Sequence, residues 1–142
     1  MRTITFTVPG EPQGKQRVRS ALIRNRIHTY NTEHNEREAN RTLFWFLHAV
    51  RESGELWPPL EQAAVEITAY YALPESKSKA WKAAALAGEY VPVRKPDLDN
   101  IAKLILDALN GAAYADDSHV GRLVLSKRYA EAPCVEVTIS EL

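Results

Sequence analysis

The stretch KPDLDNIAKLILDALNGAAYADD, from Lys95 to Asp117, carries the strongest structural signal in the chain. Its apolar residues recur with the spacing of one helical face, at Ile101, Leu104, Ile105, Ala108 and Leu109. Pro96 cannot continue a helix from upstream, and Asn110-Gly111 supplies a left-handed stop. We therefore predict an amphipathic helix from Leu98 to Leu109 that buries one continuous stripe.

Acidic residues gather around this predicted helix. Asp97 and Asp99 lie at its start. A twelve-residue helix is roughly 18 Å long, and residues 111–117 can span roughly 20 Å when extended, so Asp117 can be carried back to the other two acids. Three converging carboxylates repel one another unless a divalent cation is bound. Mg²⁺, a hard cation that keeps several waters, is the natural partner.

The same acids also have a purely structural interpretation. Asp97 and Asp99 are residue types that cap a helix or favour its first turn, and Asp116-Asp117 can form an ordinary turn. Lys103 lies four residues after Asp99 on the face opposite the stripe, where it can form a solvated ion pair with Asp107. Each acid taken alone favours this interpretation, whereas the ordered set favours a site.

The ordered set resembles the signature of the RusA family of Holliday junction resolvases. That signature has a DLDN motif, a lysine in the following helix, a D-A-L turn and a closing pair of aspartates. The matching residues are Asp97-Leu98-Asp99-Asn100, Lys103, Asp107-Ala108-Leu109 and Asp116-Asp117. A looser resemblance extends over most of the chain and includes Val8-Pro9-Gly10 with Lys15-Gln16-Arg17.

The resemblance implies a Mg²⁺-dependent, structure-selective endodeoxyribonuclease. Such an enzyme resolves four-way DNA junctions by paired symmetric nicks in recombination and repair, of either host or phage DNA. By this resemblance Asp97, Asp99 and Asp117 are the metal-binding acids, with Asp116 as the alternative to Asp117. Lys103 is the catalytic lysine. The resemblance also implies a homodimer, since two sites related by a two-fold axis suit two symmetric cuts.

Basic residues are concentrated near the start of the chain although the formal net charge is zero. Residues 1–51 contain nine basic and four acidic residues, whereas residues 52–142 contain nine and fourteen. The basic segment holds Lys15, Arg17, Arg19, Arg24 and Arg26. Alternate positions of an extended segment point to one side, which suits contacts with successive DNA phosphates. Ordinary solvated charge is the alternative interpretation.

The remaining patterns predict a small α/β domain of the α+β type. We expect strands over residues 3–8, 64–73, 120–130 and 134–139, a short strand at 27–30 in a hairpin, and helices at 32–53 and 76–87. The last two strands are expected to pair as a hairpin. The prediction is a mixed or antiparallel sheet of about four strands packed against helices, similar to the RusA fold.

Length and composition favour one cytoplasmic domain spanning residues 1–142. No apolar stretch approaches the roughly 18 residues that a membrane-spanning helix needs, and no signal peptide opens the chain. Two other functions stay open. One is a non-cleaving junction- or nucleic-acid-binding protein of the same fold, and the other is a Mg²⁺-dependent phosphohydrolase acting on small phosphates.

Overall fold

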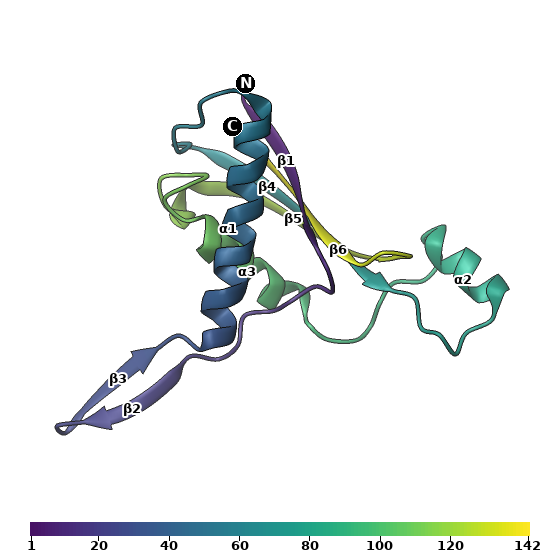
Figure 1. Cartoon of the computed structure of the whole chain (residues 1–142), viewed down its shortest axis with the longest axis horizontal. Helices are drawn as coiled ribbons and strands as arrows, with labels where there is room; N and C mark the ends of the chain where they lie inside the picture. The colour runs from purple at the N-terminus through teal and green to yellow at the C-terminus, as the bar shows by residue number, and fades with distance from the viewer.

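A computed structural model describes residues 1–142, with the side chain of Arg19 outside the description. The elements follow in the order β1 (Thr3–Pro9), β2 (Arg19–Ile23), β3 (Arg26–Tyr30), α1 (Glu33–Ser53), β4 (Ala63–Ala72), α2 (Lys79–Leu86), α3 (Leu98–Leu109), the 3₁₀ helix η1 (Asp117–His119), β5 (Val120–Ala130) and β6 (Cys134–Glu141). The α+β class predicted from the sequence is confirmed (Figure 1).

The main sheet has four strands in the order β1-β6-β4-β5. β6 pairs antiparallel with β1 and β4, while β4 and β5 are parallel, so the sheet is mixed. The predicted hairpin of the last two strands is wrong, because β4 lies between them. β4 buries Val65, Ile67, Ala69 and Tyr71, each at most 1% exposed. The most apolar strand gains most from neighbours on both edges.

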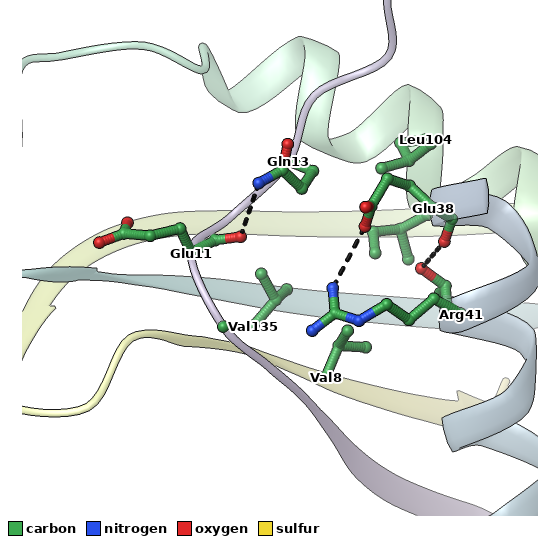
Figure 2. A pocket seen from close by; sticks show the side chains of 10 residues that line it. Val8, Glu11, Gln13, Glu38, Arg41, Leu104 and Val135 are labelled. Carbon is green, nitrogen blue, oxygen red and sulfur yellow. Dashed lines mark hydrogen bonds and ion pairs between the residues drawn. The ribbon is translucent and has the colours of Figure 1, made fainter. Parts of the chain in front are cut away.

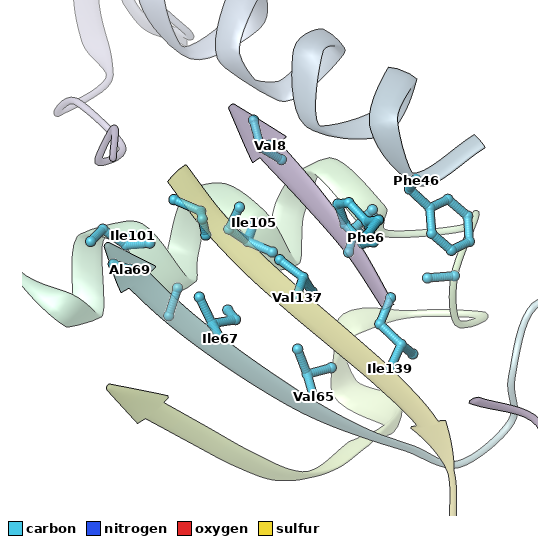
Figure 3. Close-up of a cluster of buried hydrophobic side chains, with 14 of the residues drawn as sticks. Phe6, Val8, Phe46, Val65, Ile67, Ala69, Ile101, Ile105, Val137 and Ile139 are labelled. Carbon is cyan, nitrogen blue, oxygen red and sulfur yellow. The ribbon is translucent and has the colours of Figure 1, made fainter. Parts of the chain in front are cut away.

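Helices α1 and α3 cover one face of this sheet and contact each other (Figure 1). Figure 3 shows Ile101 and Ile105 of α3 and Phe46 of α1 directed at the sheet, where Val137 lies. The Phe46 ring meets the Phe6 ring edge-on at 5.8 Å between centroids. Burying a side chain of this size stabilises a fold by about 1.5–3 kcal/mol. The apolar stripe of α3 therefore fixes that helix to the sheet.

The helix boundaries follow local capping signals. α3 spans Leu98–Leu109 as predicted, and the left-handed Gly111, with φ of 80°, follows its end. α1 begins after Thr32, whose side-chain oxygen accepts a hydrogen bond from the Asn35 N–H, and it ends at the left-handed Gly54. Both helices are therefore defined by residues that can be read from the sequence.

Strands β2 and β3 form a separate two-stranded sheet, here called the arm (residues 19–30). Arg24 and Asn25 form its two-residue turn, with φ of 51° and 62°, which is the pattern of a type I′ hairpin turn. Figure 1 shows the arm projecting away from the main sheet, beyond the start of α1.

Helix α2 lies apart from the other two helices and contacts β5 (Figure 1). Its N-cap is Ser78, and its Trp81 stacks on Tyr90 at 4.9 Å between ring centroids. Among the described helices, none combines the length and the apolar character that crossing a bilayer requires.

Candidate active site

Asp97 occupies the N-cap position of α3 but does not use its side chain as a cap. Its backbone is extended, with φ of −73° and ψ of 152°, and its carboxylate makes no capping hydrogen bond. The side chain is exposed. The structure therefore does not support the capping interpretation, and the carboxylate faces solvent at the positive end of the helix dipole.

Asp99 and Lys103 form an ion pair one helical turn apart. Their Oδ2 and Nζ atoms lie 3.9 Å apart, and both side chains are more than half exposed. The predicted neighbourhood of this acid and this lysine is confirmed. Asp107, which shares their helix face, instead pairs with Lys15 from the basic segment. Lys103 therefore pairs with the acid at the start of α3, whereas Asp107, nearer the end of the same helix, pairs with Lys15 of the connection between β1 and the arm.

That connection, here called the strap (residues 10–16), runs from β1 toward the arm and lies against α3. The Lys15 N–H donates to the Asn100 carbonyl at 3.0 Å. A Cβ atom at Gly14 would lie 2.9 Å from the Pro96 Cβ and 3.1 Å from the Asn100 Cβ. Only glycine permits this approach, so the strap sits directly on the helix start that carries the acids.

Helix α1 holds the strap from the other side. Asn35, 3% exposed, accepts from the Gln16 N–H at 2.7 Å and donates to the Gln16 carbonyl at 2.9 Å. His34 Nε2 donates to the Gly14 carbonyl at 3.0 Å. Neither contact has a local sequence signal, because each joins residues 19 or 20 positions apart.

The N-terminal end of the strap is fixed against the sheet and α1. The Gly10 N–H donates to the Pro133 carbonyl at 3.0 Å. Figure 2 shows Glu38 of α1 paired with Arg41 beside Gln13 of the strap, with 3.2 Å between the carboxylate and guanidinium. Glu38 is 9% exposed, and the ion pair with Arg41 offsets the cost of burying its carboxylate. The strap is thus tied at both of its ends.

Two open hollows meet at the strap. The first, of about 480 Å³, is lined by Asp97 together with Lys95, Asn100 and His34. The second, of about 420 Å³, is lined by Arg17 and Lys103 and shares Lys15, Gln16 and Asn100 with the first. The hollow with the acid thus adjoins a hollow lined by positive charge, an arrangement that suits a phosphate backbone passing over the strap.

Tyr71 positions the chain immediately before Asp97. Its hydroxyl donates to the Pro96 carbonyl at 2.6 Å, and the Arg94 and Lys127 cations lie 5.2 and 5.0 Å from its ring centroid. Burial raises the pKa of Tyr71 to about 12, with the Arg94 charge opposing and the Asp97 charge reinforcing the rise. The alternating strand pattern predicted only that Tyr71 is a core residue, whereas the structure shows that it also holds the segment before Asp97.

The closing acids lie at the other end of α3. Asp116 accepts from the Ser118 N–H at 3.0 Å, and hydrogen bonds from Ser118 lower the pKa of Asp116. The buried Tyr114 donates to the Leu106 carbonyl at 2.7 Å. Burial raises the pKa of Tyr114, and the charges of Asp117 and then Asp107 add to the rise. The Asp117 charge therefore lies near Tyr114 and the C-terminal half of α3.

The predicted convergence of Asp97, Asp99 and Asp117 on one cation is not found within the chain. Among the described residues, no three His, Cys, Asp or Glu side chains lie close enough to hold one metal ion. The reason is the path of residues 111–117, which is fixed at the helix end by bonds from the Ala115 N–H to the Leu60 carbonyl and from the Gly111 N–H to the Tyr114 carbonyl.

The two acids at the helix start still suit one mode of magnesium binding. Mg²⁺ in phosphoryl-transfer sites keeps several waters and uses one or two carboxylates plus oxygens of the substrate phosphate. Asp97 and Asp99 offer two exposed carboxylates without a third. The donor set fits that open mode and does not fit a closed site of three acids.

The predicted phosphate-binding residues fall into two groups. Lys15 and Arg17 line the hollows at the strap. Arg24 and Arg26 lie at the tip of the arm, exposed to solvent. The side chain of Arg19, at the base of the arm, lies outside the description. The structure therefore places Lys15 and Arg17 beside the acids and Arg24 and Arg26 on the projecting arm.

The fold is a four-stranded mixed sheet that presents two acids and a lysine at the start of α3, next to Lys15 and Arg17, and this set of residues suits an enzyme that acts on nucleic acid phosphates. Residues 9–140 match the family model described as "Endodeoxyribonuclease RusA". The chain belongs to the RusA family, and membership implies Holliday junction resolvase activity; these nucleases generally depend on a divalent metal.

The chain is also similar to the uncharacterized protein YqaN of Bacillus subtilis (strain 168). The two are 33% identical over 147 residues, covering 100% of this chain and 99% of that protein. The family resemblance inferred from the DLDN motif and its following lysine is confirmed.

Proposed function

We propose that this chain is a Mg²⁺-dependent endodeoxyribonuclease that resolves four-way DNA junctions in recombination and repair. It would act as a single domain over residues 1–142 and cut two strands at symmetric positions. The observation that supports this most directly is the free Asp97 carboxylate beside the Asp99–Lys103 pair, on a helix start overlaid by the strap and adjoined by Lys15 and Arg17.

Asp97 and Asp99 are the residues that would hold the cation. Their carboxylates are exposed and lie at the end of α3 where the helix dipole is positive. When bound, Mg²⁺ supplies charge neutralisation at the scissile phosphate and a lowered pKa for the attacking water. The protein contributes the placement of the two acids, through the Tyr71 hydrogen bond to Pro96 and the packing of the α3 stripe.

Lys103 stabilises negative charge that develops on the phosphate. In the free protein its ammonium group is paired with Asp99 at 3.9 Å, and more than half of its side chain is exposed. A weak, solvated pair of this kind is worth at most about 1 kcal/mol, so the lysine can turn to the phosphate at little cost. An ammonium group aimed at developing oxyanion charge lowers the barrier to hydrolysis.

Lys15 and Arg17 bind the DNA backbone that crosses the strap. Both line the positively charged hollow that contains Lys103. Phosphate contacts of this type set the register of the DNA and carry no sequence information. They therefore align the scissile phosphate with the acids at the start of α3.

We assign Asp117 to catalysis as an acid supplied across the two-fold axis of a homodimer. Within one chain it lies with Asp107 near the other end of α3, and the eight-residue separation of Asp99 and Asp107 corresponds to about 12 Å of helix. A dimer with two equivalent sites matches the two symmetric cuts that a junction requires. Asp116, held by Ser118, is the less available of the two closing acids.

Cleavage of a mobile four-way junction, compared with linear duplex and with or without Mg²⁺, tests the function. We expect paired nicks in the junction only with Mg²⁺, and Asp97→Asn should abolish them while junction binding persists. Binding without nicking would identify a non-cleaving junction-binding protein. Hydrolysis of a small phosphate ester, unaffected by replacing Lys15, would identify a phosphohydrolase.

A further inference from the structure

The arm exposes apolar side chains that no other part of the fold covers. Leu22 is 71% exposed, Ile27 is 77% exposed and Ile23 is 51% exposed. A two-stranded hairpin alone is marginally stable in water, and large apolar side chains clustered at its tip mark a surface that contacts a partner. The arm projects from the rest of the fold in Figure 1, so these side chains are accessible to a partner.

The register of the arm places an apolar pair next to its turn. Leu22 pairs with Ile27, so the two side chains lie side by side on one face. Ser20 and Thr29 lie one step farther from the tip on the same face, 3.4 Å apart between hydroxyl oxygens. The apolar character of this face is thus confined to its distal end.

The charge around the apolar pair selects an anionic partner. Arg24 in the turn and Arg26 next to it are both exposed, and the sequence has no acidic residue from Pro12 to Asn31. The arm of a second copy would bring the same positive charges, which repel. A polyanion with apolar surfaces to contact satisfies both features, and DNA with unstacked bases has this chemistry.

The arm is close enough to the acids to touch the same DNA. Lys15 is bonded to Asn100 of α3, and the four-residue connection to Arg19 spans at most about 14 Å. A five-residue strand is about 17 Å long, the rise of about five base pairs. The tip can therefore contact DNA at most about 31 Å, or about nine base pairs, from the phosphate held at the strap.

We propose that the arm inserts the Leu22–Ile27 pair at the branch point of a DNA junction while Arg24 and Arg26 contact the flanking phosphates. This rests on the proposed function for its substrate. Apolar side chains inserted between bases must unstack them, and the open form of a four-way junction has unstacked bases at its centre. The arm would then favour junctions over continuous duplex, in which the same insertion costs a stacked step.

The test uses a junction with 2-aminopurine at the branch point, whose fluorescence rises when it is unstacked. The protein is the full chain carrying Asp97→Asn, with and without the further pair Leu22→Ser and Ile27→Ser. We expect the parent to raise the fluorescence several-fold and the arm variant to abolish that rise. We also expect the arm variant to lose about tenfold in junction affinity and nothing in duplex affinity.

The matched control carries Ser20→Ala and Thr29→Ala, on the same face of the arm but away from its tip. This control should behave as the parent does. An equal fluorescence rise with the arm variant overturns the proposal. A shift of the arm variant from dimer to monomer in sedimentation, with fluorescence unchanged, identifies the arm as a contact between copies and overturns it too.

The two proposals fail in different ways. If the parent binds the junction without any fluorescence change, the arm proposal is wrong and the proposed function stands. If the parent shows no preference for a junction over duplex, and the chain without substitutions does not cut junctions, the proposed function is wrong as well.

Discussion

Replacing Gly14 by alanine should both slow junction cleavage and destabilise the fold. The added Cβ would lie 2.9 Å from the Pro96 Cβ and 3.1 Å from the Asn100 Cβ. Carbon atoms in contact prefer about 3.5–4.0 Å, so the strap must move away from α3 by about 0.5–1 Å. Both neighbouring atoms are fixed to the backbone, and neither can rotate out of the way.

The movement breaks specific interactions. The Lys15 N–H loses its bond to the Asn100 carbonyl, and the Lys15–Asp107 pair is disturbed. Overpacking of this type costs about 1–3 kcal/mol of unfolding free energy. A displacement of about 1 Å in a positioning element can reduce turnover about 100-fold. We therefore expect a single-turnover rate about 10- to 100-fold lower, with destabilisation of about 2 kcal/mol.

Gly54→Ala is the matched control. Nothing lies within 4 Å of a Cβ at this position, and φ is +70°, so the substitution introduces backbone strain without a clash. That strain costs about 1–2 kcal/mol, similar to the expected cost at Gly14. Urea unfolding and single-turnover cleavage are measured for both variants. Equal cleavage rates for the Gly14 variant and the unaltered chain would refute the role of the strap.

Three further predictions concern charge, assembly and pH. Replacing Lys15 and Arg17 by alanine should reduce the slope of log binding constant against log salt by about 2, measured by filter binding, and an unchanged slope would exclude phosphate contacts. A heterodimer of one Asp97→Asn chain and one Asp117→Asn chain should nick one strand of a junction, because one of its two composite sites keeps both acids. If the heterodimer nicks neither strand, each site takes Asp97 and Asp117 from the same chain. Tyr71 has its pKa raised to about 12 from 10, so the unfolded chain releases its proton first; unfolding free energy should fall from pH 10 to 12, and Tyr71→Phe should remove part of that fall in pH-dependent urea unfolding.

Local features of the fold could be predicted because their causes are local. The bounds of α3 follow from its apolar spacing, from Pro96 before it and from Asn110-Gly111 after it. The bounds of α1 follow from Thr32 and Gly54 in the same way. The strand order could not be predicted from similar signals, because the position of β4 between β5 and β6 depends on pairing between residues far apart in sequence.

The same distinction between local and long-range causes applies to the candidate site. The Asp99–Lys103 pair follows from a spacing of four residues on a helix, and the structure shows it. The position of Asp117 depends on how Leu60 holds residues 113–115, a contact that spans more than 50 residues. The support of the strap by His34 and Asn35 also required the tertiary structure, since neither residue has a distinctive sequence pattern.

The placement of β6 has a consequence for biosynthesis. β1, near the N-terminus, has β6 as its partner in the main sheet, and β6 in turn joins it to β4. During translation, β1 therefore cannot pair in the main sheet until β6 has left the ribosome. Nascent chains stalled before Cys134 should remain sensitive to protease along β1 and α1, and release of the completed chain should protect both segments together.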